Sequence, residues 1–281
     1  MTTTAASPEA GAQEALPSRP RRGAGLLRHV NLPGIAFLAV LVVLWELVVR
    51  GGLLDFQFLP APTEVLDGAQ SLIEGGELWS AVLHTALVAV GGWILASTLG
   101  AVVGIALGLS PALWRWTASS IELLRSFPSI TFVPLAVLLL GFSYKMELVV
   151  VIYASQWPVL VNTMDGVRGV SPGLRDVTRT LGMSRLRSLR TVILPAAASK
   201  MLVGLRLGLN LSLILAVAAE IVGNPQGLGY ELVFEQQALQ PGRMFAYFIA
   251  IGLLGMLLNA LFQLAVRWLM PGVIAATDRK G

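Results

Sequence analysis

Long apolar blocks separated by short polar segments make up most of this chain. Each block is close to the roughly 20 residues that a helix needs to cross the hydrocarbon core of a membrane. Six such blocks cover residues 32–49, 81–109, 121–142, 148–164, 201–222 and 244–269. The pattern predicts an all-α fold, a polytopic membrane bundle of about six transmembrane helices.

Proline interrupts two of these predicted spans. Pro128 and Pro134 fall in the third and Pro158 in the fourth, where each removes a backbone donor from the helix. Broken helices commonly line the pathway of a transporter, although the same residues could produce simple kinks. Pro134 is therefore a candidate pathway residue. Asn210 in the fifth span is another, because its amide could contact an anion or a neighbouring helix.

Small residues recur at every fourth position of the second span. A row with this spacing lies on one helix face and lets another helix approach closely. We expect the neighbour to be a helix of the same chain, with a second copy of the chain as the alternative. The row consists of Gly92, Ala96, Gly100, Gly104 and Gly108.

Charge supports a membrane protein and predicts its orientation. Only 13% of the residues are charged, about half the share in soluble domains, and the mean hydropathy is +0.74. An isoelectric point near 9.8 could suggest nucleic acid. However, Lys and Arg lie between the apolar blocks, so they indicate membrane topology and no nucleic-acid partner. Their excess before the first span and after the fourth and sixth predicts that both termini are cytoplasmic.

These assignments divide the chain into three parts. Residues 1–30 are rich in Ala, Pro, Ser and Gly without periodicity, which predicts a disordered cytoplasmic tail. Residues 31–270 form the predicted transmembrane domain, with a cytoplasmic loop at about 165–200. Residues 271–281 form a cytoplasmic C-terminal tail. We expect a multi-pass protein of the cell membrane, in contact with lipid.

The residues that catalysis or cofactor binding would need are missing. The chain has no cysteine and only two histidines, His29 and His84, so we expect no disulfide and no thiolate or histidine-rich metal centre. None of its three lysines belongs to a Gly-Lys-Ser/Thr P-loop. We therefore expect no enzyme activity and no cofactor in this chain, and we interpret both histidines as structural.

The basic loop at 165–200 predicts two short amphipathic helices. The Ser-Pro pair at 171–172 is typical of a helix start, and Gly182 is typical of a helix end, because glycine adopts the left-handed conformation at little cost. Ser184 can cap a second helix, which we expect Pro195 to end. Either an interfacial helix pair or a protein docking surface would have this pattern.

The same loop resembles the cytoplasmic signature of ABC importer permeases. That signature is Glu-Ala-Ala, three residues, Gly, nine residues, then Ile-x-Leu-Pro. Asp176, Val177 and Thr178 stand at the Glu-Ala-Ala positions, Gly182 follows after three residues, and Leu194-Pro195 close the pattern. The spacing matches throughout, whereas the first triplet keeps only a shortened carboxylate.

Other stretches look like the permeases of the nitrate, sulfonate and taurine importer group. In this order, together with the loop spacing, they extend the resemblance over roughly residues 33–270. They are FLPAPTEV (58–65), HTALVAVGGW (84–93), LLRSFPSITFVPL (123–135) and GLRLGLNLSLILAVAAEIVGNPQGLGY (204–230).

The resemblance implies the type I importer permease fold and a set of partners. In such importers the loop is a coupling helix that sits in a groove of a separate ATPase subunit, so ATP and Mg²⁺ belong to that partner. Two ATPase subunits, an extracytoplasmic solute-binding protein and a second permease copy are implied. The implied substrate is a small anion, a sulfonate or taurine first and nitrate next. Arg179 and Arg185 could pair with acidic rims of the ATPase groove.

Glu220 is an ionisable residue within a predicted span, and such residues are functional candidates. It lies near the outer end of the fifth span, before a turn that contains Gly227 and Gly229 and an amphipathic stretch at 230–239. Our hypothesis is an outer gate formed by Glu220 and this turn. The alternative is a carboxylate at an ordinary helix end.

Two other classes of function require features that the sequence lacks. A secondary transporter driven by an ion gradient would carry paired charged residues at mid-membrane. An intramembrane enzyme would need convergent His, Asp or Ser residues in its spans. Neither pattern is evident in the six blocks.

A topology reporter tests the predicted orientation. A reporter that is active only in the cytoplasm should give full activity when fused after Ser188, because the loop is predicted to be cytoplasmic. A reporter that is active only outside the cell should be silent at the same position. The two fusions are assayed in whole cells at matched expression, and the reversed result would contradict the topology.

Overall fold

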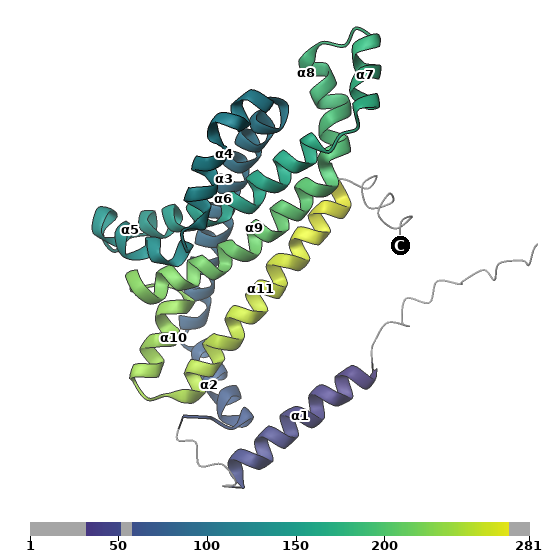
Figure 1. Ribbon diagram of the computed structural model, residues 1–281. Coiled ribbons are helices and arrows are strands. Elements are labelled where there is room, and N and C mark those ends of the chain that lie inside the picture. The colour runs from purple at the N-terminus through teal and green to yellow at the C-terminus, as the bar shows by residue number, and fades with distance from the viewer. Residues whose placement is uncertain (1–31, 52–57, 270–281) are drawn as a thin grey trace, which may run out of the picture. The chain divides into compact units, whose positions relative to one another are not determined.

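Helices make up the regular structure of this protein. The computed structural model describes residues 32–51 and 58–269, and no strand occurs among them (Figure 1). A 3-10 turn lies at Ser129–Thr131 and a π-turn at Leu189–Ile193. The α-helices are α1 (Leu32–Arg50), α2 (Pro62–Glu74), α3 (Glu77–Leu109), α4 (Pro111–Ser126), α5 (Phe132–Leu140), α6 (Tyr144–Arg168), α7 (Pro172–Thr180), α8 (Arg185–Ser188), α9 (Leu194–Gly223), α10 (Leu228–Gln237) and α11 (Pro241–Leu269).

The described chain falls into two units. The first contains α1 up to Leu44, an apolar helix in which side chains such as Phe37 and Leu38 are exposed. The second begins at Trp45 and contains the remaining helices. The two predicted tails, residues 1–30 and 271–281, lie outside the described residues.

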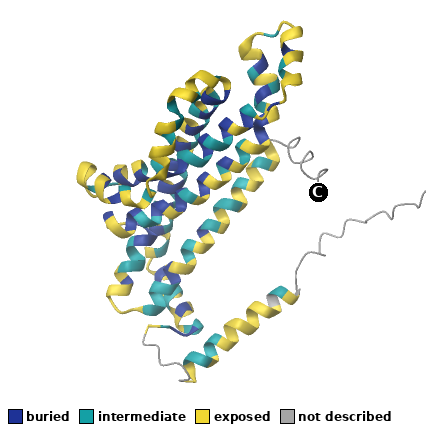
Figure 2. Cartoon of the chain, in the orientation of Figure 1, coloured by how far each residue is buried: buried dark blue, intermediate teal, exposed yellow. Residues whose placement is uncertain are grey.

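The core of the second unit is formed by α3, α6 and α9. Helix α6 packs against both α3 and α9, and the buried residues of these helices line their shared surfaces (Figure 2). Val88, Val150 and Ala216, one from each helix, belong to one buried apolar cluster and have no solvent exposure. Exposed apolar side chains cover much of the outside, as expected where a bundle faces lipid tails.

The row of small residues on α3 brings its backbone against α6 of the same chain. A Cβ atom added at Gly100 would lie 2.7 Å from the carbonyl oxygen of Gln156, and one added at Gly104 would lie 2.6 Å from that of Leu160. Both distances are too short for a real contact, so only glycine allows this approach. All five residues of the row are buried.

Helix α9 approaches α6 in the same way. A Cβ atom at Gly204 would lie 2.8 Å from the carbonyl oxygen of Pro158, and one at Gly208 would lie 3.1 Å from that of Ser155. Helix α6 is therefore held between two glycine-bearing helices.

Three predicted spans correspond to helices that are long and apolar enough to cross a membrane. In the described residues these are α3, the continuous run Arg185–Gly223 and α11. The predicted fourth span lies within α6 and the first within α1.

The predicted third span is wrong as a single helix. Helix α4 ends at Ser126, α5 begins at Phe132, and the two are bent by 76°. The cause is Pro128, because a residue before proline favours the extended conformation, and Phe127 has ψ 128°. Helices α4 and α5 therefore form a broken span or a re-entrant loop.

Enlarging a glycine of the α3 row should destabilise the bundle. Gly104→Ala places a methyl group against the backbone of α6, and overpacking of this kind costs roughly 1–3 kcal/mol. Gly91→Ala is the matched control on the same helix, because its Cβ would meet only ordinary contacts, the nearest at 3.6 Å. Thermal unfolding in detergent should show a lower midpoint for Gly104→Ala only. Equal midpoints for the two variants would contradict the packing account.

Candidate functional site

Helices α7 and α8 and the turn between them form a hairpin, residues 172–188, which projects at one end of the second unit (Figure 1). Gly182 lies in the turn with φ 63°, the left-handed region that glycine adopts without strain. Its N–H donates to the carbonyl oxygen of Arg179, and that of Met183 donates to the carbonyl oxygen of Thr178, at 2.9 and 3.0 Å. This pair of bonds is a Schellman motif, which satisfies the last carbonyls of α7.

Buried hydroxyl groups fasten the two helices of the hairpin together. The Ser188 hydroxyl donates to the Thr178 hydroxyl at 3.1 Å, and Thr178 donates to the carbonyl oxygen of Arg175 at 2.7 Å. The Arg175 guanidinium in turn donates to the carbonyl oxygen of Val167, near the end of α6, at 2.7 Å. The hairpin is thus tied to the membrane bundle through its own first helix.

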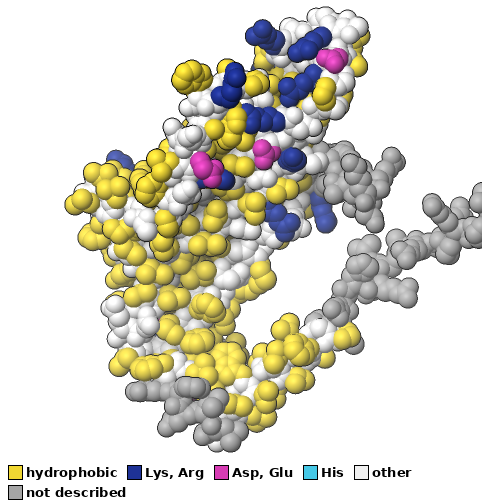
Figure 3. Space-filling model, viewed as in Figure 1, with side chains coloured by type: hydrophobic (Ala, Val, Ile, Leu, Met, Phe, Trp, Pro, Cys, Tyr) yellow, Lys and Arg dark blue, Asp and Glu magenta, His cyan; other side chains and the backbone are white. Residues whose placement is uncertain are grey.

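The outer face of the hairpin is apolar and basic. Its exposed apolar side chains are Leu174, Val177, Leu181 and Leu186. Of the other predicted coupling residues in the hairpin, three are exposed, namely Asp176, Arg179 and Arg185. Thr178 is buried. Lys and Arg side chains gather around this end on the face drawn in Figure 3.

Pro195 does not end the second helix as expected, although it does lie in the first turn of the next helix, α9. The helix runs without a break from Arg185 to Gly223, and Leu194 and Pro195 lie inside it. A π-turn at Leu189–Ile193 precedes the proline. The wider turn changes the register of the backbone hydrogen bonds just where proline lacks an N–H, so the helix continues through it.

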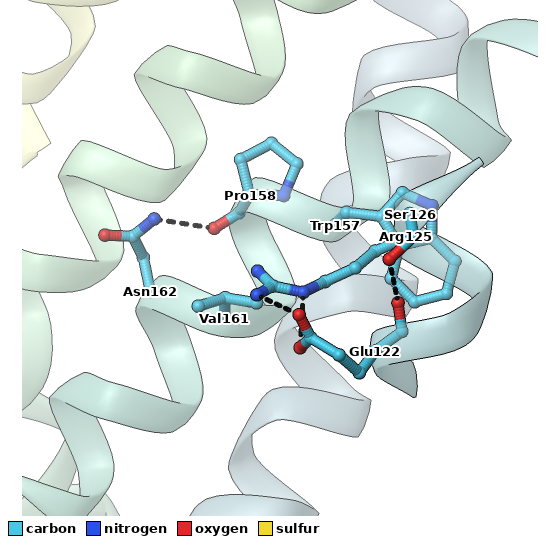
Figure 4. Close-up of a pocket in the computed structure, with 7 residues that line it drawn as sticks. All are labelled: Glu122, Arg125, Ser126, Trp157, Pro158, Val161 and Asn162. Atoms are coloured by element: carbon cyan, nitrogen blue, oxygen red, sulfur yellow. Dashed lines mark hydrogen bonds and ion pairs between the residues drawn. The ribbon is translucent and has the colours of Figure 1, made fainter. Parts of the chain in front are cut away.

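A pocket lies beside the middle of α6, between that helix and the end of α4 (Figure 4). The Arg125 guanidinium donates two hydrogen bonds to the Glu122 carboxylate, Nε to Oε2 at 2.8 Å and Nη2 to Oε1 at 2.9 Å. Both side chains stay partly exposed in the single chain, Arg125 by 42% and Glu122 by 62%. The other lining residues are Ser126, Trp157, Pro158, Val161 and Asn162.

Aromatic residues of α6 hold the broken end of α4 at this pocket. The Tyr153 hydroxyl donates to the carbonyl oxygen of Leu124 at 2.8 Å, and its ring stacks on Phe132 with centroids 4.4 Å apart. Arg125 was not among the predicted site residues, although it lies within the predicted third span, residues 121–142. An ionisable residue beside a proline break was the signal that could have identified it.

Three of the five predicted gate or pathway residues meet at the opposite end, where α9 leads into α10. Glu220 is 1% exposed, and its Oε2 accepts a hydrogen bond from the Gly229 N–H at 2.8 Å. Gly227 lies against the same carboxylate and has φ 92°. A side chain at this position would clash with Glu220. Asn210 does not join them. It is exposed on α9, ten residues before Glu220, which is about 15 Å along the helix axis. Pro134 is exposed on α5.

Three residues that the sequence analysis did not select as functional join Glu220 at this end. His84 of α3 bonds to Glu147 of α6 through its Nε2, 2.9 Å from Oε2. The Asn224 amide donates to the other oxygen of Glu147 at 2.6 Å. Glu147 was missed because the predicted fourth span began one residue after it.

Helix α10 is also tied to the start of α11. Glu235 of α10 is 2% exposed and pairs with the Arg243 guanidinium at 2.9 Å. Burial raises the pKa of the Glu235 carboxyl, and the charge of Arg243 opposes that rise.

Comparison with known proteins assigns the chain to a family. Residues 96–275, about two-thirds of the chain, match the binding-protein-dependent transport system inner membrane component. The chain belongs to this family of permeases. The prediction of an ABC importer permease is therefore confirmed, and a gradient-driven transporter is not favoured.

The permease is similar to several curated proteins over most of its length. It is 30% identical to a putative aliphatic sulfonates transport permease of Bacillus subtilis, covering 89% of this chain and 91% of the relative. It is 31% identical to the taurine transport system permease of Escherichia coli, covering 88% and 91%. It is 26% identical to the nitrate import permease of a Synechocystis strain, covering 86% and 91%. These relatives are transport subunits rather than enzymes.

Solved structures support the fold of the permease. An inward-facing methionine ABC transporter matches with a TM-score of 0.58 at 18% identity, covering 68% of this chain and 94% of that one. An amino acid ABC transporter matches with a TM-score of 0.54 at 21% identity, covering 71% and 95%. The predicted all-α permease fold is thereby confirmed.

Proposed function

We propose that this permease moves a small anion by alternating access and is driven by ATP hydrolysis on separate subunits. The observation that carries the coupling part is the hairpin. Its apolar side chains are exposed at one end of the bundle with arginines beside them, as a helix that docks into a groove requires. Its spacing also matches the importer signature at Gly182 and at Leu194-Pro195.

The proposed assembly has two ATPase subunits at the hairpin end, which is cytoplasmic together with both termini. Arg179 and Arg185 pair there with acidic residues of the ATPase groove. An extracytoplasmic solute-binding protein docks at the α10 end, where the Glu220 turn serves as an outer gate. The gate role of Glu220, Gly227 and Gly229 stays a prediction.

The pocket on α4 supports a second copy of the permease. Charged side chains in membrane segments face protein or a water-filled path, because hydrocarbon solvates them poorly. The Glu122–Arg125 pair is exposed in the single chain at the level of the middle of α6. We infer that this face meets the partner permease across the translocation pathway of a homodimer.

The proposed substrate is an anion of the sulfonate class, with taurine first and nitrate next. The sulfonate, taurine and nitrate permeases among the relatives support this choice. Arg125 supports it chemically, because a guanidinium presents forked donors to planar and tetrahedral oxyanions. In this role Arg125 exchanges its Glu122 partner for the passing anion.

The hairpin turn should be required for coupling. In the reconstituted importer, Gly182→Val should lower transport per ATP hydrolysed by roughly tenfold, because a β-branched residue is strained at φ 63°. The measurement is substrate uptake into proteoliposomes beside phosphate release in the same preparation.

Gly182→Asn is the matched control for backbone strain. Asparagine tolerates the left-handed conformation, so this variant should keep most of the coupling. No Cβ contact within the chain would interfere, since nothing lies within 4 Å of that position. Normal coupling in Gly182→Val would contradict the proposed role of the hairpin.

Arg125 should be needed for the anion and not for ATP hydrolysis. Arg125→Gln should lower taurine uptake by at least roughly tenfold, because the substrate loses a charge-assisted partner. Arg125→Lys should retain part of the uptake because it keeps the charge. Basal ATP hydrolysis should be unchanged in both variants.

Arg115→Gln is the matched control on the same helix. Arg115 is exposed near the start of α4, seven residues before Glu122 and about 10 Å away along the helix axis. Its replacement should leave uptake near the level of the unchanged protein. Normal uptake by Arg125→Gln would refute the anion role while leaving the coupling proposal standing.

A further inference from the structure

Three helices bring ionisable side chains together at the α10 end of the bundle. His84 comes from α3, Glu147 from α6 and Glu220 from α9, and one donor atom of each lies within 4.8 Å of the others. Glu147 has no exposure and Glu220 only 1%. Asn224, which is also buried, bonds to Glu147 and approaches His84 Nε2 at 3.4 Å.

The charges of this cluster are not balanced by the described side chains. Glu147 and Glu220 are two buried carboxyl groups, and among the described residues His84 is the one basic side chain that bonds to either of them. A buried carboxylate without a compensating cation is costly, so such groups are paired or coordinate metals. The cluster is therefore short of positive charge whenever both carboxylates are ionised.

One oxygen of Glu220 lacks a standard hydrogen bond in this arrangement. Oε2 accepts the hydrogen bond from the Gly229 N–H, at the N-terminus of α10. Oε1 is fully buried and makes no hydrogen bond of standard geometry, and the Thr85 hydroxyl is the polar side chain that interacts with this carboxylate. This acceptor lies on the same carboxylate that contributes to the cluster.

The donor set fits a divalent transition metal. One imidazole nitrogen and two carboxylate oxygens are ligands of Zn²⁺ and its neighbours in the first transition row. Tetrahedral ligands at about 2.1 Å from the ion stand roughly 3.4 Å apart. The three donor atoms lie within 4.8 Å of one another, and the His84–Glu147 pair, at 2.9 Å, has to open slightly to admit the ion. A water molecule can take the fourth position, as in zinc sites with three protein ligands.

An approach for the ion exists from the α10 side. An open pocket there is lined by Glu220 and Asn224, and also by Pro225 and Tyr230. Hydrogen bonds from Asn224 and the Gly229 N–H orient the carboxylates, as second partners commonly do around metal ligands.

We propose that His84, Glu147 and Glu220 form a binding site for one Zn²⁺-class divalent ion that joins the ends of α3, α6 and α9. The ion takes the place of the proton between His84 and Glu147, and that proton leaves to solvent. His84 then binds as neutral imidazole and both glutamates as carboxylates. The sequence predicted no histidine-rich centre, and a mixed site with a single histidine is a different arrangement.

Cobalt binding to the full chain tests this site. The chain is purified in detergent with a histidine-free affinity tag, stripped with chelator and titrated with Co²⁺ while visible absorption is recorded. We expect one Co²⁺ per chain, with the intense bands of a low-coordinate ion, and displacement by Zn²⁺. His84→Gln should weaken binding by at least roughly tenfold and should abolish the metal-dependent rise in thermal unfolding midpoint.

A cysteine variant distinguishes lost ligation from lost folding. His84→Cys should keep one site and add a thiolate-to-Co²⁺ charge-transfer band, which can arise nowhere else because the chain has no cysteine. Glu235→Gln is the matched control, since Glu235 is an equally buried carboxylate that pairs with Arg243 outside the cluster. Failure of the monodisperse unchanged chain to bind Co²⁺ would overturn the proposal. Undiminished binding by His84→Gln would overturn it as well.

Discussion

The close approach of α6 to two glycine-bearing helices is the constraint on which the rest of the structure depends. In lipid the hydrophobic effect does not drive helices together, so their contact relies on van der Waals packing and hydrogen bonds. At Gly104 and Gly204 the backbones come so near that no methyl group would fit. This contact positions both ends of α6. One end holds Val167, to which the hairpin is hydrogen-bonded, and the other end holds Glu147 of the cluster.

Apolar side chains serve two different purposes on the surface of this protein. Along the bundle they suit contact with lipid, and they cover much of the face drawn in Figure 3. On the hairpin they stand among exposed arginines, beyond the bundle. Leu181 and Leu186 are as exposed as side chains of the bundle surface, yet the charges around them mark an aqueous setting. Location relative to charge, rather than hydrophobicity, separates the proposed docking surface from the rest of the apolar surface.

The sequence predicted local features of this fold better than long-range ones. Long apolar blocks identified α3, α9 and α11, because composition alone is enough to predict a long membrane helix. The bend after Phe127 and the π-turn before Pro195 depend on how the chain packs around a proline, so the proline alone predicted only an interruption. Gly182 was predictable because its conformation follows from the residue type.

The spacing of residues in the sequence predicted the hairpin. It did not predict the cluster of His84, Glu147 and Glu220. His84 and Glu147 stand 63 positions apart in the chain and meet only because α3 and α6 run side by side. A single sequence contains no signal for that pairing. The sequence did not predict the Arg125 pocket for another reason. The exposure of Arg125 depends on the break between α4 and α5.

Helix α8 continues into α9 without a break, so one helical run connects the hairpin with the Glu220 turn. The helix that begins at Arg185 in the hairpin carries Glu220 near its other end, about 50 Å away by helix rise. Between them the π-turn is the one irregularity in this run, and it lies next to the hairpin. A tilt of α8 would therefore also move the Glu220 end of the run, and the close contact of α6 at Gly204 and Gly208 would constrain that movement.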